Sequence, residues 1–283
     1  MLKRIITALI ATVVFIPILI FSHTWAFPIA MAVAAFLGCF EMISCVGKRK
    51  SFFFTVPICL ASVFFPLAVR YSYLMRISFS DFALFAFGIA LIFALYVFAV
   101  AVFDNKNTSV TNAALLYVAC LYIISAFTAI VYIRDYVPYG EYVYLLAFIC
   151  AWMTDIFAYF TGRLFGKHKL IESVSPKKTV EGAIGGIAFC VLSLIVFGLI
   201  IDNRLDSEGI IKAHYGILAI SGVFISVVSQ VGDLIMSLIK RKYGIKDYGK
   251  LFPGHGGILD RFDSVIAVTL ILAFICTYFN LFS

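Results

Sequence analysis

The chain has 283 residues, of which 63% are hydrophobic and only 13% are charged, and its mean hydropathy is +1.06. This composition is far more apolar than that of a soluble globular domain and excludes one. The formal net charge is +7, and the Lys and Arg residues are distributed unevenly along the chain.

The apolar residues form long runs, each near the ~20 residues that a helix needs to cross the hydrocarbon core. Helices are expected because lipid offers no partners for unpaired backbone groups. We therefore expect an all-α, polytopic integral membrane protein with about nine transmembrane helices, at residues 5–22, 25–46, 52–70, 82–103, 112–133, 142–162, 180–201, 213–239 and 263–281. The first two should form a tight helical hairpin. The third span contains Pro57 and Pro66, and the eighth is long and contains an acid, so these two depart furthest from a plain apolar span.

The basic residues predict an orientation. With nine spans and the N-terminus inside, most Lys and Arg residues fall in cytoplasmic segments, chiefly residues 163–178 and 240–261. Positive charge is enriched on the cytoplasmic side of membrane proteins. The expected location is therefore the cell's inner (cytoplasmic) membrane, with both basic loops facing the cytoplasm.

Three acids lie inside or at the edge of these spans. Asp155 lies midway along the sixth span, Asp233 lies towards the cytoplasmic end of the eighth, and Glu41 lies near the inner end of the second. An acid at such depth normally faces protein or water and marks a functional pathway, although a helix–helix hydrogen bond is the alternative. Glu41 could instead snorkel or pair with Lys48–Lys50.

Residues 237–263 combine basic side chains with acids around a PGHGG turn. Basic groups and backbone amides suit phosphates, whereas paired carboxylates suit divalent cations. Together at a membrane face, they indicate phosphate chemistry on a lipid. The basic residues are Lys240, Arg241, Lys242, Lys246, Lys250 and Arg261, and the acids are Asp247, Asp260 and Asp263.

Asp260 and Asp263 have the i, i+3 spacing that places two side chains on one face of the first turn of a helix beginning after Gly257. They could simply compensate the helix dipole. Two adjacent carboxylates repel, however, unless a cation such as Mg²⁺ or a neighbour such as Arg261 neutralises them. With Asp233, they form a reasonable ligand set for a hard cation that also binds nucleotide phosphates.

The glycines around His255, at Gly254, Gly256 and Gly257, permit positive φ and a close backbone approach to a ligand. A simple re-entry turn would explain the glycines but not the histidine. His255 could donate to a phosphate, carry a proton or cap the turn.

The second basic loop contains a comparable set of polar residues. Ser175 and Pro176 indicate a turn, and Lys177 and Lys178 supply charge. Thr179 can cap the next helix, whose first turn holds the acid Glu181. The loop could be no more than a topology signal, or it could complete a pocket for a polyanion.

The stretch S-x-x-K-R-x-x-x-x-K-D-x-G-x-x-x-P-x-H-G-G-x-x-D-R-x-D, from Ser237 to Asp263, resembles the signature of the phosphatidate cytidylyltransferases, or CDP-diacylglycerol synthases. The segments TDIFAYFTGRLFGKHKL, from Thr154, and SPKKTVEGAIGG, from Ser175, resemble two further motifs of that family in the same order. Thr154 departs from the Asn that some relatives carry before the acid. The N-terminal half resembles the family only in being polytopic, with Glu41 at the place of an acid often found there.

The resemblance implies that CTP and phosphatidate react to give CDP-diacylglycerol and pyrophosphate. It implies catalytic residues at Asp155, Asp233, His255, Asp260 and Asp263, with Mg²⁺ held by Asp233, Asp260 and Asp263 and a second cation sharing the site. Phosphate-handling and other substrate contacts are expected from Ser175, Lys177, Lys178, Thr179, Glu181, Lys240, Arg241, Lys246, Asp247, Gly256, Gly257 and Arg261.

The chain is thus expected to divide by role. Residues 1–150 would be a transmembrane scaffold with oligomer contacts, and residues 151–283 would be the catalytic transmembrane region with the two basic cytoplasmic loops. The resemblance suggests a homodimer in the lipid bilayer, and no nucleic acid partner is expected.

Two other functions fit parts of the pattern. A CTP-dependent polyprenol or diacylglycerol kinase is similar to this family, but it would need a base to deprotonate a hydroxyl. The SPKK and HGGxxDRxD motifs favour the transferase. A transporter using Asp155 and Asp233 would be supported by inverted repeats, which the sequence does not suggest.

Overall fold

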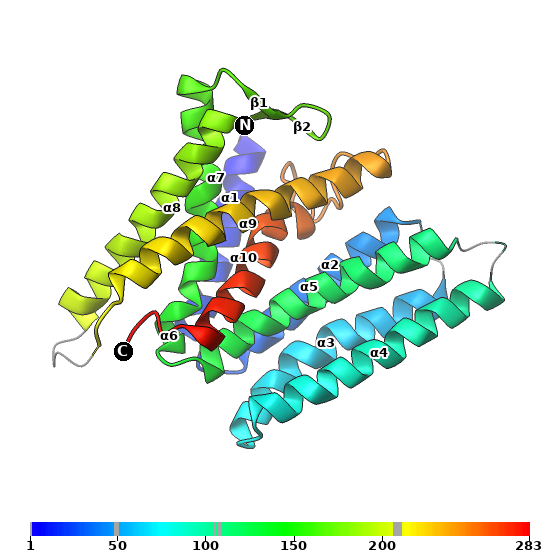
Figure 1. The fold of residues 1–283 in the computed structure, drawn as a ribbon. Coiled ribbons are helices and arrows are strands. Elements are labelled where there is room, and N and C mark those ends of the chain that lie inside the picture. Colours follow the sequence, from blue (N-terminus) through cyan, green and yellow to red (C-terminus); the bar gives the residue numbers. More distant parts are fainter. Residues whose placement is uncertain (1, 48–50, 105, 107–108, 206–210) are drawn as a thin grey trace. The chain divides into compact units, whose positions relative to one another are not determined.

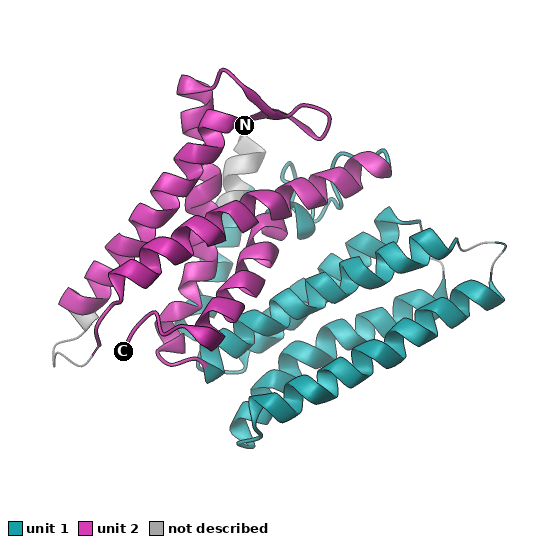
Figure 2. Cartoon of the chain, in the orientation of Figure 1, with its two compact units in different colours: residues 1–136, 243–261 teal, residues 137–242, 262–283 magenta. Residues whose placement is uncertain are grey.

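The computed structural model describes residues 2–47, 51–104, 106, 109–205 and 211–283. The chain forms two compact units, coloured separately in Figure 2. Unit 1 comprises residues 1–136 and 243–261, and unit 2 comprises residues 137–242 and 262–283. The boundary near residue 261 falls inside a helix. This is a division by packing, and the division by role expected at residue 150 stays a prediction.

Unit 1 is built from long apolar helices: α1 (Leu2–Ile20), α2 (Ala26–Cys45), α3 (Phe52–Leu74), α4 (Phe79–Phe103) and α5 (Val110–Tyr136). Of these, α2 to α5 pack side by side (Figure 1). α2, α3 and α5 pack on one another, and α4 packs on α3 and α5. Fully buried side chains from three of them, including Phe27, Ile58 and Ile123, form the core. α3 remains continuous through Pro57 and Pro66. α1 and α2 are joined by a short turn, as predicted, but the two helices contact each other little, so the tight packing of the predicted hairpin is not confirmed.

A buried ion cluster ties three parts of unit 1 together. Arg70 on α3 donates to Asp135 on α5 and to the backbone carbonyl of His23 in the α1–α2 turn. Arg134 also donates to Asp135 Oδ1, at 3.1 Å. The Asp135 side chain is fully buried. Because a buried charge is costly without a partner, this cluster fixes the helix ends relative to one another.

Unit 2 contains α6 (Gly140–Val143), α7 (Leu145–Phe165), α8 (Val180–Ile200), the π-helical turn η1 (Ile201–Leu205) and α9 (Tyr215–Lys242). α8 packs closely on α7 because two of its glycines leave room for the neighbouring backbone. A Cβ at Gly182 would lie 2.6 Å from the Ala158 carbonyl oxygen, and one at Gly186 would lie 3.0 Å from that of Thr154.

The helix α10 (Leu259–Tyr278) begins in unit 1 and belongs to unit 2 from Phe262 onward. After it, the chain end pairs with residues 212–214 of unit 2. Lys212 exchanges backbone hydrogen bonds with Ser283, and His214 donates to the Leu281 carbonyl.

The basic segment between α7 and α8 forms a β-hairpin, where the sequence predicted a loop. The turn predicted at Ser175 and Pro176 is wrong, because both residues lie in a strand. Strand β1 (Lys169–Ile171) pairs antiparallel with β2 (Ser175–Thr179), and Lys169 lies opposite Thr179. The hairpin extends from the ends of α7 and α8 (Figure 1). Apart from this two-stranded sheet, helices dominate the described residues, so the all-α membrane class is confirmed in its coarse form.

Among the described residues, seven helices are long and apolar enough to cross a membrane. They are Ala26–Cys45, Phe52–Leu74, Phe79–Phe103, Val110–Tyr136, Gly140–Phe165, Val180–Asn203 and Tyr215–Lys242. α1, whose apolar part is Leu9–Ile20, and α10 also coincide with predicted spans but are not among these seven. The predicted number of nine is therefore not confirmed, although each predicted span overlaps a helix.

Candidate active site

An ion pair lies at the centre of the charged side chains in unit 2. Lys178, near the end of β2, places its Nζ 2.5 Å from Oδ2 of Asp233 on α9. Each side chain is only about a quarter exposed, at 25% and 24%. Ser237, one turn further along α9, donates to Asp233 Oδ1 at 3.4 Å. The strand and the helix thus bring together two residues that the sequence singled out separately.

Two further acids of unit 2 converge through one serine. Ser264 on α10 donates its hydroxyl to Asp155 Oδ2 on α7 at 2.8 Å, and its backbone N–H donates to Asp263 Oδ1 at 3.0 Å. The Asp263 carboxylate is repelled by Asp233 and Asp155 and attracted by Lys240. The three acids and the two lysines therefore form one electrostatic cluster, which we call the acidic cluster: Asp155, Lys178, Asp233, Lys240 and Asp263. Sequence reasoning had not identified Ser264, whose only signal is its position directly after Asp263.

The PGHGG turn of unit 1 is held by Asp260. Its Oδ2 accepts hydrogen bonds from the backbone N–H groups of Tyr248, at 2.8 Å, and Gly257, at 3.0 Å. The Asp260 side chain also occupies the space that a Cβ on Gly256 would need, 2.6 Å from Oδ2. Gly256 has φ +83°, which an L side chain rarely adopts. Asp260 thus stabilises the turn through its own hydrogen bonds. The sequence predicted a role in metal binding for Asp260 but not these contacts.

Within the same turn, the backbone N–H of His255 donates to the Phe252 carbonyl at 2.8 Å, and the Phe252 N–H donates to the Gly256 carbonyl at 2.9 Å. Gly254 also has positive φ, at +80°, whereas Gly257 does not. The turn geometry expected from the glycines is present at two of the three positions.

The β-hairpin is closed at its base by the capping residues of α8. Thr179 Oγ1 accepts from Gly182 N at 3.1 Å, which confirms the predicted N-cap. Glu181 reaches back to accept from the backbone N–H of Lys167, at 3.1 Å, and lies 2.6 Å from Nδ1 of His168. Both residues were also predicted to contact substrate, and the structure shows them in contacts within the chain.

The remaining predicted phosphate ligands differ in exposure. Lys177, Arg241, Lys246, Asp247 and Arg261 are exposed, whereas Lys240 and Ser175 are half-buried. Lys240 and Arg241 lie in the last turn of α9 in unit 2. Lys246, Asp247 and Arg261 belong to unit 1.

The donor chemistry of the acidic cluster suits a hard cation. Carboxylates are the ligands that Mg²⁺ prefers, and a cation would relieve the repulsion among Asp155, Asp233 and Asp263. Within the described residues, however, no three His, Cys, Asp or Glu side chains stand in metal-binding geometry. In this structure the Lys178 ammonium forms an ion pair with Asp233 and neutralises its charge. The residues fit a divalent cation in chemistry, and binding would require their side chains to rearrange.

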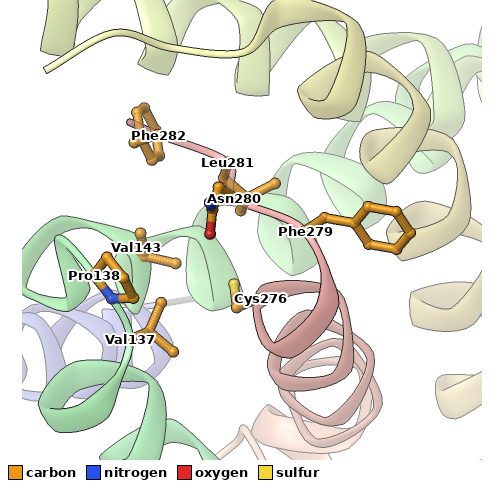
Figure 3. Close-up of a pocket in the computed structure, with 8 residues that line it drawn as sticks. All are labelled: Val137, Pro138, Val143, Cys276, Phe279, Asn280, Leu281 and Phe282. Carbon is orange, nitrogen blue, oxygen red and sulfur yellow. The ribbon is translucent and has the colours of Figure 1, made fainter.

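A small pocket in unit 2 lies at the other end of α10 and is lined mainly by apolar side chains (Figure 3). Val137, Pro138 and Val143 face Cys276 and the C-terminal segment, where Asn280 is the polar side chain. Cys276 is 13 positions after Asp263, which corresponds to about 20 Å along a helix. The pocket has no charged lining residue and is therefore not a candidate phosphate site.

Comparison with known proteins identifies the family. The Cytidylyltransferase family matches residues 2–279. A phosphatidate cytidylyltransferase of Bacillus subtilis (strain 168) is 32% identical over 286 residues, covering 99% of each chain. Those of Staphylococcus haemolyticus (strain JCSC1435), 43% identical over 133 residues, and Brucella abortus biovar 1 (strain 9-941), 42% identical over 135 residues, align with about half of each chain. The chain belongs to the cytidylyltransferase family.

Proposed function

We propose that this chain is an integral membrane enzyme that transfers the cytidylyl group of CTP to phosphatidate, giving CDP-diacylglycerol and pyrophosphate for phospholipid synthesis. The observation that carries the proposal is the relationship to the Bacillus subtilis phosphatidate cytidylyltransferase along 99% of both chains. The acidic cluster supports it, because it gathers acidic and basic side chains from four segments of unit 2, namely α7, β2, α9 and α10.

The reaction requires alignment more than covalent chemistry. A phosphate oxygen of phosphatidate attacks the α-phosphorus of CTP, the bond from that phosphorus to the bridging oxygen of the β-phosphate breaks, and pyrophosphate leaves with the electron pair. The nucleophile is already an anion, so no residue has to deprotonate it. The main task of the protein is to orient mutually repelling phosphates and to offset their charge.

We assign these tasks to the basic residues. Lys178, oriented by Asp233, would hold a phosphate of the substrates, together with the exposed Lys177 and the Ser175 backbone. Lys240 and Arg241 at the end of α9 would bind the triphosphate, as would Lys246 and Arg261 on the turn segment. Ammonium and guanidinium groups form charge-assisted hydrogen bonds with phosphate oxygens, which are the strong class of such bonds.

Mg²⁺ is the proposed cofactor, with Asp233, Asp260 and Asp263 as its ligands. Asp155 would line the same polar region through its hydrogen bond with Ser264. When bound, the cation would neutralise phosphate charge and favour departure of pyrophosphate.

The cytoplasmic orientation and a homodimer are also proposals. The orientation is supported by the basic residues gathered in 163–178 and 240–261, as the positive-inside rule requires. The homodimer is supported only by the resemblance to the family.

The test uses membranes from cells that express the chain, incubated with phosphatidate and CTP labelled at either the α- or the γ-phosphorus. Transfer of cytidylyl predicts that the α-label enters lipid and the γ-label appears in pyrophosphate. Entry of the γ-label into lipid, with diacylglycerol or polyprenol as acceptor, would indicate the kinase instead. Membranes carrying Asp233→Asn are the control for endogenous activity, and they should show no gain over untransformed cells.

A further inference from the structure

Glu41 on α2 is bonded to the segment that contains the PGHGG turn. Its Oε1 accepts from the backbone N–H of Ile258 at 3.0 Å, and its Oε2 accepts from that of Leu259 at 2.9 Å. The residue is buried, and both partners belong to unit 1. These N–H groups stand at the start of α10, where the helix itself provides no acceptor. Glu41 therefore caps the N-terminus of α10, although it lies more than 200 residues earlier in the chain.

The turn segment also closes around the Glu41 carboxylate. A Cβ on Gly249 would lie 2.4 Å from Glu41 Oε1, and one on Gly257 would lie 2.1 Å from it. Neither glycine has positive φ, so the backbone conformation does not require glycine at these positions. The close approach of the carboxylate does, because it leaves no room for a side chain.

Glu41 and Asp260 divide three successive amides between them. Asp260 takes the N–H of Gly257, and Glu41 takes those of Ile258 and Leu259. The adjacent His255 has its Nδ1 buried without a hydrogen-bond partner among the described residues. Buried polar atoms are normally hydrogen-bonded. The imidazole of His255 can donate or accept a hydrogen bond, so its unpaired Nδ1 is suited to binding a polar ligand.

We propose that Glu41 is a positioning residue for CTP: it holds the turn in the conformation that presents His255 and the basic residues of the same segment to the triphosphate. This inference rests on the proposed cytidylyl transfer. For Glu41 the sequence left open a functional pathway, snorkelling or pairing with Lys48–Lys50. These lysines lie outside the described residues, and the partners that the structure shows are the backbone amides of Ile258 and Leu259. The two backbone N–H donors at the start of α10 offset negative charge on the Glu41 carboxylate, which would otherwise repel a triphosphate nearby.

Two variants remove the contact in different ways. Glu41→Gln keeps the shape but loses the charge and one acceptor. Gly249→Ala keeps the carboxylate but displaces it, because the new methyl group would overlap Oε1. The matched control is Gly88→Ala on α4, where an added Cβ meets nothing within 4 Å. The measurements are the KM for each substrate, kcat, and hydrogen–deuterium exchange of the peptide covering residues 256–262 in the detergent-purified full-length chain.

Both variants should raise the KM for CTP by at least about tenfold, the effect of losing one hydrogen bond to a charged group. The KM for phosphatidate should change less than twofold, amide exchange in 256–262 should become faster, and Gly88→Ala should match the wild type. Three results would overturn the proposal: an unchanged KM for CTP, equal rises for both substrates, or unchanged exchange. Failure of both variants to fold would also overturn it, since Glu41 would then serve the fold alone. A wild type that forms no CDP-diacylglycerol would contradict the proposed function, and the exchange comparison would still test the contact separately.

Discussion

Replacing Lys178 by alanine should be far more damaging than replacing its neighbour Lys177. The Lys178 ammonium lies 2.5 Å from Asp233, and both side chains are about three-quarters buried. Lys177 is exposed. A hydrogen bond from this ammonium to a substrate phosphate should contribute roughly 1.5–3 kcal/mol. Since about 1.4 kcal/mol corresponds to a factor of ten, Lys178→Ala should lower kcat/KM roughly 10- to 100-fold. Its loss also leaves Asp233 facing two other acids without this counter-charge.

The assay is the initial rate of CDP-diacylglycerol formation by equal amounts of monodisperse protein, with CTP and phosphatidate varied in turn. Lys177→Ala should also lower the rate, but by only about threefold, because an exposed charge contributes less than a partly buried one. Lys178→Arg should recover part of the rate, since the planar guanidinium restores the positive charge but not the position of the compact ammonium group. Equal losses at Lys177 and Lys178 would refute the reasoning and indicate general attraction to anionic lipid.

Three further substitutions test other parts of the molecule. Asp263→Glu should lose nearly as much activity as Asp263→Ala, because Mg²⁺ tolerates little displacement of a ligand; a Mg²⁺ titration with wild-type half-saturation would exclude direct ligation. Glu181→Gln should speed proteolytic cleavage of the β-hairpin, since Glu181 holds the backbone of Lys167 and His168, and an unchanged cleavage rate would show that the hairpin does not depend on it. Arg70→Ala should destabilise the protein by roughly 3–5 kcal/mol by leaving Asp135 without this partner, with KM values unchanged; thermal inactivation measures the loss, and wild-type stability would argue against the buried ion cluster as a support.

The helices could be predicted because a membrane span depends on a local property, the length of an apolar run. Every predicted span overlaps a helix, including α3 with its two prolines and α9 with its acid. The number of membrane crossings was less predictable, since helix formation at α1 and α10 does not by itself make either a full span.

The β-hairpin was missed because strand β2 has no apolar alternation. Its sequence, SPKKT, begins with a turn-forming pair and continues with two lysines. The strand is specified by partners elsewhere, namely the pairing of Thr179 with Lys169 and the contact of Glu181 with His168. Contacts between residues that are apart in the sequence leave no periodic pattern in the sequence.

The candidate site shows the same limit. Residue types and spacing identified Asp233, Asp260 and Lys178 as important, but not which atoms they bond. The sequence left several roles open for Glu41 and did not indicate the partners that the structure shows, which are backbone amides more than 200 residues away; Lys48–Lys50 lie outside the described residues. Likewise, Asp260 and Asp263 share a motif, yet only Asp260 supports the turn.

The central claim is that a phosphate oxygen of phosphatidate attacks the α-phosphorus of CTP on this chain. It is tested most directly with purified protein and phosphatidate whose phosphate carries ¹⁸O, by mass spectrometry of both products. Attack by the phosphatidate oxygen retains all the ¹⁸O in CDP-diacylglycerol and leaves none in the pyrophosphate, and the rate should fall in Lys178→Ala. Release of CDP in place of pyrophosphate, or ¹⁸O in the pyrophosphate, would contradict it.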